Sequence, residues 1–315
     1  MVRIVVGIDG SAPSLVAHEF VAGTTWPRPT TVRLVASHDV PMDWATHVPG
    51  GDWFAEVDGA ARTELMRRMD ALAEELRRVG MVPEVHLARG PAAIVLIDQA
   101  REWASDLIVV GNRGRGPRTS ALLGSVSASV ADHAPCPVLV VRQPRATRML
   151  LAVDGSPSAT AIPQVLRGWS GFRQLPVDVV SVAQPTPRAD AGFVTAWATS
   201  EPAPAPLAVR NLAEHRDLAT AVAGRMRAAG WDASASTRVG DPADEILRAA
   251  HDLGADLIVT GSRGLGDLQR LLVGSVAHEV LLRASQSVLV VRGHVAADIA
   301  RRPVALAGSQ RAPAG

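Results

Sequence analysis

The sequence predicts an α/β protein with two tandem domains, each a five-stranded, doubly wound, Rossmann-like parallel sheet. Two observations lead to this prediction. The second half of the chain repeats the first, and in each half apolar β-branched runs alternate with helix-like segments. With 315 residues, 47% of them hydrophobic, the chain is long enough for two domains with ordinary cores.

Three pairs of segments recur in the same order in both halves. RIVVGIDGS at 3–11 matches RMLLAVDGS at 148–156, ASDLIVVGNRG at 104–114 matches GADLIVTGSRG at 254–264, and CPVLVVR at 136–142 matches QSVLVVR at 286–292. The offset grows from 145 to 150 residues, and a Pro- and Ala-rich stretch at 185–206, interpreted as a loop, accommodates part of the difference. The repeat predicts domains at 1–145 and 146–293, followed by a flexible tail at 294–315.

The elements of the first copy follow from local patterns. Strands are expected at 3–9, 31–38, 83–88, 106–111 and 137–141, with helices starting at Ser14, Pro91 and Ser125. A long helix is expected before Gly80, which closes it, because one face repeats apolar residues every three or four positions: Leu65, Met69, Leu72, Leu76 and Val79. Strands that are apolar along their whole length indicate a parallel sheet covered on both faces, with ligands at the carboxyl ends of the strands.

Composition excludes several classes of function. The net charge is +1, only 3% of residues are aromatic and none is Tyr, so neither nucleic acid nor a membrane surface is an expected partner. All 32 basic residues are Arg, which excludes a P-loop lysine and a Schiff-base lysine. Cys136 is the only cysteine and is expected to be a packed core thiol. The chain starts directly with a strand and has no long apolar run, so the expected location is the cytoplasm.

A glycine-rich loop follows the fourth strand of each copy. Both loops have the spacing G-x2-G-x9-G-S, each after DLIV and before a helix; the residues are Gly111, Gly114, Gly124 and Ser125, then Gly261, Gly264, Gly274 and Ser275. Glycines let the backbone approach a ligand closely, and free N–H groups at a helix start, here on Ser125 and Val126 or Ser275 and Val276, bind anions. Ser125 is also expected to cap its helix. The loops therefore predict phosphate binding, to which Arg113 and Arg263 either add charge or remain solvated loop side chains.

With these motifs the chain resembles the universal stress proteins in their tandem, ATP-binding form, which have an adenine nucleotide alpha hydrolase-like fold. The resemblance covers nearly all of residues 1–293 and implies that the loop residues bind the phosphates and ribose of ATP, with Mg²⁺ as an optional companion. It implies further that Asp9 and Asp154 contact the nucleoside and that Gly7 and Ala152 line the same pocket. The alternative for the two aspartates is that DGS is only a helix-start signature, in which Ser11 and Ser156 cap the helices; both roles can coexist.

Three functions remain open on the sequence alone: an ATP-binding regulator in the stress response, a slow ATPase or phosphotransferase, and an interaction module without nucleotide. The nine histidines include no H-x3-H pair, and no general base or paired carboxylates accompany the loops, so little turnover is expected. The resemblance favours the regulator. It also implies that the apolar last strands, PVLVV and SVLVV, pair the two copies within one chain, and leaves open a homodimer of whole chains.

Overall fold

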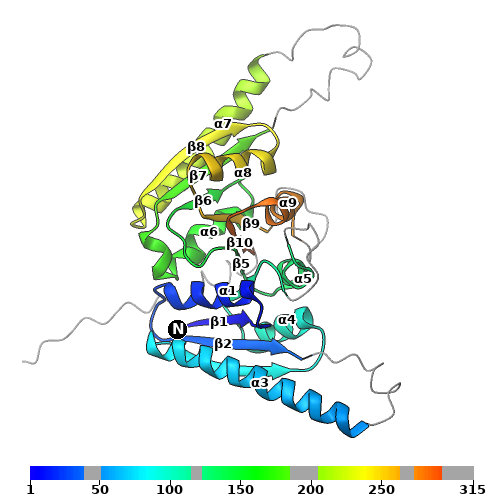
Figure 1. Ribbon diagram of the computed structural model, residues 1–315. Helices are drawn as coiled ribbons and strands as arrows, with labels where there is room; N and C mark the ends of the chain where they lie inside the picture. Colours follow the sequence, from blue (N-terminus) through cyan, green and yellow to red (C-terminus); the bar gives the residue numbers. More distant parts are fainter. Residues whose placement is uncertain (39–50, 115–122, 185–204, 263–272, 293–315) are drawn as a thin grey trace, which may run out of the picture.

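A single ten-stranded sheet forms the centre of the computed structural model, which describes residues 1–38, 51–114, 123–184, 205–262 and 273–292 (Figure 1). The strand order is β3-β2-β1-β4-β5-β10-β9-β6-β7-β8. The first repeat contributes β1 (Val2–Gly7), β2 (Thr30–Ser37), β3 (Val82–Ala88), β4 (Leu107–Gly111) and β5 (Val138–Val141). The second contributes β6 (Met149–Ala152), β7 (Val177–Ala183), β8 (Ala233–Val239), β9 (Leu257–Gly261) and β10 (Ser287–Val291).

Helices cover both faces of this sheet. One face packs against α1 (Ala12–Gly23), α3 (Gly51–Arg78), α6 (Pro157–Arg167) and α7 (Ala205–Ala228). The opposite face packs against α4 (Ala92–Glu102), α5 (Ser125–His133), α8 (Pro242–Asp252) and α9 (Ser275–Arg283), and a short 3-10 helix, η1 (Ser170–Gln174), follows α6. Successive strand residues alternate between the two cores, as Ile4 and Val5 do in β1. The predicted doubly wound α/β fold is confirmed.

Both repeats have the same internal topology. In the first, β1 pairs in parallel with β2 on one side and with β4 on the other, and in the second β6 pairs in the same way with β7 and β9. The chain direction across the sheet reverses at β1 and at β6. Doubly wound folds bind ligands in the crevice at this switch point, which lies between the carboxyl ends of β1 and β4 and of β6 and β9.

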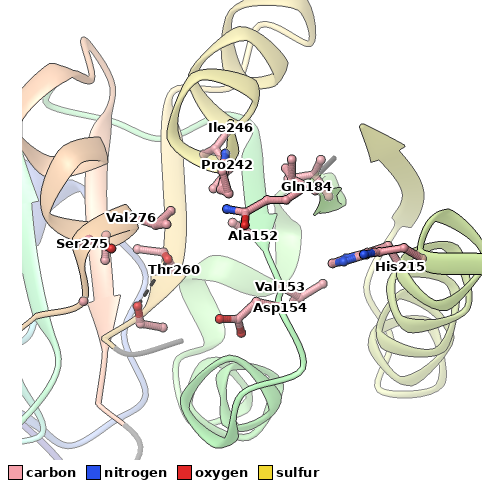
Figure 2. A pocket seen from close by; sticks show the side chains of 16 residues that line it. Ala152, Val153, Asp154, Gln184, His215, Pro242, Ile246, Thr260, Ser275 and Val276 are labelled. Atoms are coloured by element: carbon pink, nitrogen blue, oxygen red, sulfur yellow. Dashed lines mark hydrogen bonds between the residues drawn. The ribbon is translucent and has the colours of Figure 1, made fainter. Parts of the chain in front are cut away.

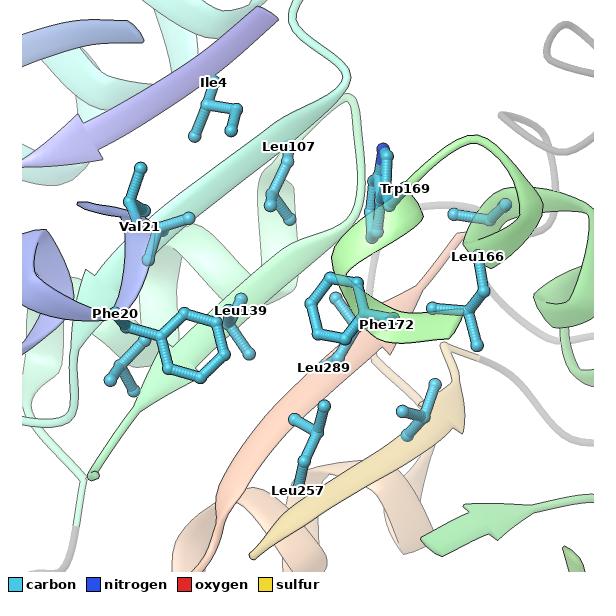
Figure 3. Close-up of a cluster of buried hydrophobic side chains, with 14 of the residues drawn as sticks. Ile4, Phe20, Val21, Leu107, Leu139, Leu166, Trp169, Phe172, Leu257 and Leu289 are labelled. Carbon is cyan, nitrogen blue, oxygen red and sulfur yellow. The ribbon is translucent and has the colours of Figure 1, made fainter. Parts of the chain in front are cut away.

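The two half-sheets meet at β5 and β10. These strands are antiparallel, with Leu139 opposite Leu289, and both leucines are fully buried. Phe20 lies 6.4 Å from Phe172, measured between ring centroids, and Trp26 lies 6.1 Å from Trp169. Figure 3 shows Phe20 and Leu139 of the first repeat facing Phe172 and Leu289 of the second. The repeats therefore share one continuous sheet and the apolar cluster on each of its faces.

Several local predictions for the first repeat agree with the structure and others do not; the helix expected to start at Ser14, for example, is α1 and starts at Ala12. Gly80 follows α3 with a φ of 83°, as expected of a C-terminal glycine. Cys136 is buried in the core, and burial raises the pKa of its thiol. The assignment of Val79 to the apolar face was wrong: this side chain is 45% exposed, because α3 has already ended at Arg78.

Two predicted segments fall mainly outside the described residues, namely the loop at 185–206 and the tail at 294–315. In the ranges that the structure does cover, no helix is both long and apolar enough to cross a bilayer.

Truncating either leucine of the β5–β10 pair, as Leu139→Ala or Leu289→Ala, is expected to lower the free energy of unfolding by about 2–5 kcal/mol, because each leaves a cavity at the junction. The double variant is expected to lose less than the sum, since the two side chains are neighbours. Urea denaturation followed by circular dichroism measures both effects. Leu15→Ala on the surface of α1 is the control, and strictly additive losses would contradict direct coupling across the junction.

His18 on α1 is expected to make the protein less stable in mild acid. Burial lowers the pKa of this imidazole below its ordinary value of 6.5, outweighing the opposing hydrogen bond of its Nε2 to the Leu72 carbonyl and the charge of Glu75. The unfolded chain then binds the proton more readily than the folded one, so the stabilisation is complete above about pH 6.5 and decreases as the pH falls toward the folded pKa. In urea denaturation between pH 7.5 and pH 5.5, the free energy of unfolding should fall less with decreasing pH for His18→Gln than for the exposed control His133→Gln. Equal slopes would contradict this assignment.

Candidate functional site

A cavity of about 950 Å³ lies at the switch point of the first repeat. The ends of β1 and β4, the start of α1 and the start of α5 form its walls. All eight site residues predicted for this repeat line it: Gly7, Asp9, Gly111, Arg113, Gly114, Gly124, Ser125 and Val126. Residues separated by more than 100 positions in the sequence are thus brought together at one cavity.

Gly111 lets the end of β4 approach α1 closely. A Cβ atom placed on Gly111 would lie 2.5 Å from the carbonyl carbon and oxygen of Pro13, so no larger residue fits without moving the backbone. The Ser127 hydroxyl donates to the Gly111 carbonyl at 2.6 Å, and the Gly124 N–H donates to the Asn112 carbonyl at 2.7 Å. Backbone contacts therefore hold the two ends of the glycine loop together beside the cavity.

Asp9 follows β1 and has two structural roles. Its Oδ1 accepts from the backbone N–H of Ser11 at 2.9 Å and from the Ser11 hydroxyl at 2.6 Å. A Cβ on Gly114 would lie 2.7 Å from the Oδ2 atom, so the glycine loop approaches the other side of the carboxylate. Asp9 thus orients the start of α1 and also borders the cavity.

The helix-start interpretation of DGS is confirmed for both serines. The Ser11 and Ser156 side chains cap α1 and α6 by accepting from the backbone N–H groups of Ser14 and Ala159. In the second repeat the Asp154 Oδ1 accepts from the Ser156 N–H at 2.9 Å, as Asp9 does with Ser11. The two aspartates occupy equivalent turns.

The start of α5 differs from the prediction. Ser125 was expected to cap this helix, but the N-cap residue is Gly124, with φ −78° and ψ 153°, and Ser125 is the first helical residue. Gly124 has no side chain that can accept from the first turn, and α9 begins in the same way at Gly274. First-turn N–H groups that no side chain caps are suited to bind an anionic group in the cavity.

The second repeat has a smaller cavity, of about 430 Å³, at the equivalent position (Figure 2). Six of its predicted site residues line it: Ala152, Asp154, Gly261, Gly274, Ser275 and Val276. The predicted Arg263 and Gly264 lie outside the described residues. A Cβ on Gly261 would lie 2.5 Å from the Ser158 hydroxyl and 2.9 Å from the Ala159 nitrogen, so β9 approaches α6 as closely as β4 approaches α1.

The sequence analysis missed polar residues at the second cavity, among them Gln184, Asn211 and His215. They come from the end of β7 and from α7, far from the glycine motif. The signal for His215 appears only when the long helices of the two repeats are aligned by their ends, because an apolar residue then occupies the matching position of the first repeat. The structure shows no group of three or more His, Cys, Asp or Glu side chains arranged to hold a metal ion, within the residues it describes.

Comparison with known proteins matches both repeats to one family. The sequence profile of the universal stress protein family aligns with residues 1–142 and 146–292. The chain belongs to the universal stress protein family. It is a tandem member, as the motifs predicted, and the boundary predicted at residue 145 stays a prediction that falls between the two matched segments.

Relatives of this universal stress protein match it over nearly its full length. A universal stress protein of Mycobacterium tuberculosis strain H37Rv is 30% identical over 311 residues, which cover 92% of this chain and 96% of the relative. The crystal structure of a universal stress protein from Archaeoglobus fulgidus shares the fold, with a TM-score of 0.60 and 19% identity over 92% of this chain and 98% of the other. Another solved universal stress protein, in complex with cAMP, is 25% identical over 44% of this chain and 95% of its own, with a TM-score of 0.32.

Gly111→Ala in this universal stress protein is expected to lower the free energy of unfolding by about 1–3 kcal/mol, because the new methyl group would overlap the Pro13 backbone. Gly224→Ala in α7 is the matched control. No atom outside the helix's own backbone lies within 4 Å of the Cβ that this substitution would add. The free energy of unfolding of Gly224→Ala should therefore rise by about 0.5–1 kcal/mol. Thermal and urea denaturation of both variants test the prediction, and a Gly111→Ala protein as stable as the wild type would show that the close approach is dispensable.

Proposed function

We propose that this universal stress protein binds ATP, alone or with Mg²⁺, in both repeats and acts as a nucleotide-dependent regulator of the stress response in the cytoplasm. The observation that supports this most is the meeting of a glycine loop, an uncapped helix start and the Asp9 carboxylate at one cavity. In the second repeat Asp154 and the uncapped start of α9 meet in the same way.

The phosphate end is assigned to the glycine loop and the helix start. Gly111, Gly114 and Gly124 line the cavity and let the loop backbone pack closely around it, and the N–H groups of Ser125 and Val126 donate to the phosphate oxygens. Arg113 adds positive charge at the same edge. The corresponding second-repeat residues are Gly261, Arg263, Gly264, Gly274, Ser275 and Val276, of which Arg263 and Gly264 are assigned by the repeated motif alone.

The nucleoside end is assigned to the strand ends. Gly7 and Asp9 border the first cavity at the end of β1, and Ala152 and Asp154 border the second at the end of β6. Gly7 is closely packed, since a Cβ there would lie 3.1 Å from a methyl group of Leu96. Ala152 places a methyl group at that position in the second repeat, so the two nucleoside pockets differ slightly in shape.

A regulatory role is favoured because hydrogen bonds between the two repeats connect the helices that start at the two cavities. Arg142, immediately after β5, donates from its Nη1 to the Gln286 carbonyl at 3.0 Å and from its Nη2 to the Leu281 carbonyl of α9. Reciprocally, Arg292 after β10 donates to the Ala131 carbonyl of α5. Each helix that starts at one cavity is therefore held near its other end by an arginine of the other repeat. The paired repeats of one chain form the proposed functional unit, with or without dimerisation of whole chains.

Adenine nucleotide is expected to accompany the protein when it is purified without added nucleotide. Denaturation followed by chromatography and mass spectrometry of the released molecules should give near-stoichiometric nucleotide. Gly114→Ala combined with Gly264→Ala should abolish it, because the Cβ on Gly114 meets the Asp9 carboxylate at 2.7 Å. Gly224→Ala serves as the control that keeps the ligand.

Added ATP is also expected to raise the melting temperature, since a ligand at about 100 times its Kd stabilises the folded state by about 2.7 kcal/mol. The proposal fails if no nucleotide is released and added ATP leaves the melting temperature unchanged. Release of ADP together with a metal-dependent hydrolysis rate would support the slow ATPase instead.

A further inference from the structure

The second cavity has a polar cluster, made of Gln184, Asn211 and His215. The long helices of the two repeats, α3 and α7, end at Arg78 and Ala228, so equivalent residues of these helices are 150 positions apart. The fully buried pairs Met69 and Ala219, and Leu76 and Met226, follow that correspondence.

By the same offset His215 occupies the position of the buried Leu65. The strand register likewise places Ser181 of β7 at the position of the buried Ala36 of β2, since Val180 pairs with Ala152 as Val35 pairs with Gly7. Two buried apolar residues of the first repeat are thus replaced by a hydroxyl and an imidazole.

Hydrogen bonds determine which ring nitrogen of His215 carries the proton. The Ser181 hydroxyl lies 2.9 Å from the Val153 carbonyl and 2.7 Å from the His215 Nδ1. A carbonyl can only accept, so the hydroxyl proton points to Val153 and the Nδ1 of His215 must donate to the hydroxyl oxygen. The neutral ring therefore has its proton on Nδ1 and an acceptor lone pair on Nε2.

The Nε2 atom of His215 has no hydrogen-bond partner among the residues that the structure describes, and the side chain is only partly buried. Figure 2 shows the ring extending from α7 toward the strand end that carries Val153 and Asp154, across the cavity from Ser275. Asn211 precedes His215 by four residues on α7, so both side chains share one helix face. This side of the cavity offers one acceptor and two amides opposite the helix start assigned to phosphate.

We propose that the second cavity selects its nucleotide through a hydrogen bond that the nucleoside donates to the Nε2 of His215. The inference rests on the proposed function, because it assumes that phosphate lies at the Gly274–Ser275 end. A nucleoside donor is either the exocyclic amino group of adenine or a ribose hydroxyl. The first cavity has no such acceptor at the matching position, Leu65, so the two sites differ in specificity.

The tautomer is tested in the protein without nucleotide. ¹⁵N NMR of histidine-labelled protein, with His215→Asn used to assign the signal, should show the proton on Nδ1 at a pH where the ring is neutral. A neutral ring protonated on Nε2 would overturn the inference, because that nitrogen would then donate instead of accept.

Selectivity is tested by calorimetry in a Gly114→Ala background, which leaves the second site intact. ATP is compared with ITP, whose carbonyl replaces the amino group of the base, and with 2′-deoxy-ATP. If the amino group of adenine donates to His215, ITP should bind about tenfold more weakly than ATP, the value of one hydrogen bond. If the ribose hydroxyl donates, 2′-deoxy-ATP should show this loss instead.

His215→Asn removes this discrimination while its amide still reaches the Ser181 hydroxyl, and the exposed His251→Asn leaves the discrimination unchanged. Nucleotide binding that is unaffected by His215→Asn overturns the inference alone, whereas an absence of ATP binding in the wild-type protein overturns the proposed function as well.

Discussion

The antiparallel pairing of β5 with β10 is the constraint on which the rest of the structure depends. Each repeat alone would expose an apolar edge strand, VLVV or SVLVV, with unpaired backbone groups. Pairing satisfies both edges and makes one sheet whose remaining edges, β3 and β8, are the more polar and exposed strands. Because the junction is antiparallel, the strands of the two repeats run in opposite directions. Their carboxyl ends, and with them the two cavities, therefore lie at opposite ends of the strands.

The junction also connects these separated cavities. Arg142 is partly buried between the repeats, and this burial, followed by the charge of nearby Arg113, lowers its pKa to about 10, so it remains charged at neutral pH. Arg113 lines the first cavity, whereas one of the two carbonyls to which Arg142 donates, that of Leu281, belongs to α9, whose first residues line the second cavity. A displacement of α9 on ligand binding must therefore be accommodated at an arginine that lies beside the other cavity. This is a physical route for the two sites to influence one another.

Features that depend on the local backbone were predictable from the sequence, and those that depend on distant packing were not. The repeated glycine spacing identified the two loops that border the cavities, because close approach at Gly111 and at Gly261 requires the absence of a side chain. The capping residue of α5 was misplaced by one position, since Gly and Ser are adjacent and both occur at helix starts.

Gln184, Asn211 and His215 could not be found from a motif, because they meet only when α7 packs on β7. His215 differs from its counterpart in the first repeat, but this difference is visible only when the two repeats are aligned correctly. The sequence alone does not give that alignment, because it does not show where the gaps lie. The offset changes from 145 to 150 residues somewhere between the first and last strands, and only the helix ends and strand pairs locate that change.

The two repeats are alike at the proposed phosphate end of each cavity and differ at the proposed nucleoside end. The proposed phosphate site uses backbone N–H groups beside glycines, and there the repeats share four glycines, one arginine and the Ser-Val helix start. The nucleoside side is formed by side chains, and there Gly7 corresponds to Ala152, Ala36 to Ser181 and Leu65 to His215. Side chains can be exchanged without moving the backbone, so duplicated cavities can differ in specificity while they share the proposed way of holding phosphate. Two such cavities in one chain, joined through Arg142 and Arg292, would allow a single protein to respond to two ligand states if both bind nucleotide as proposed.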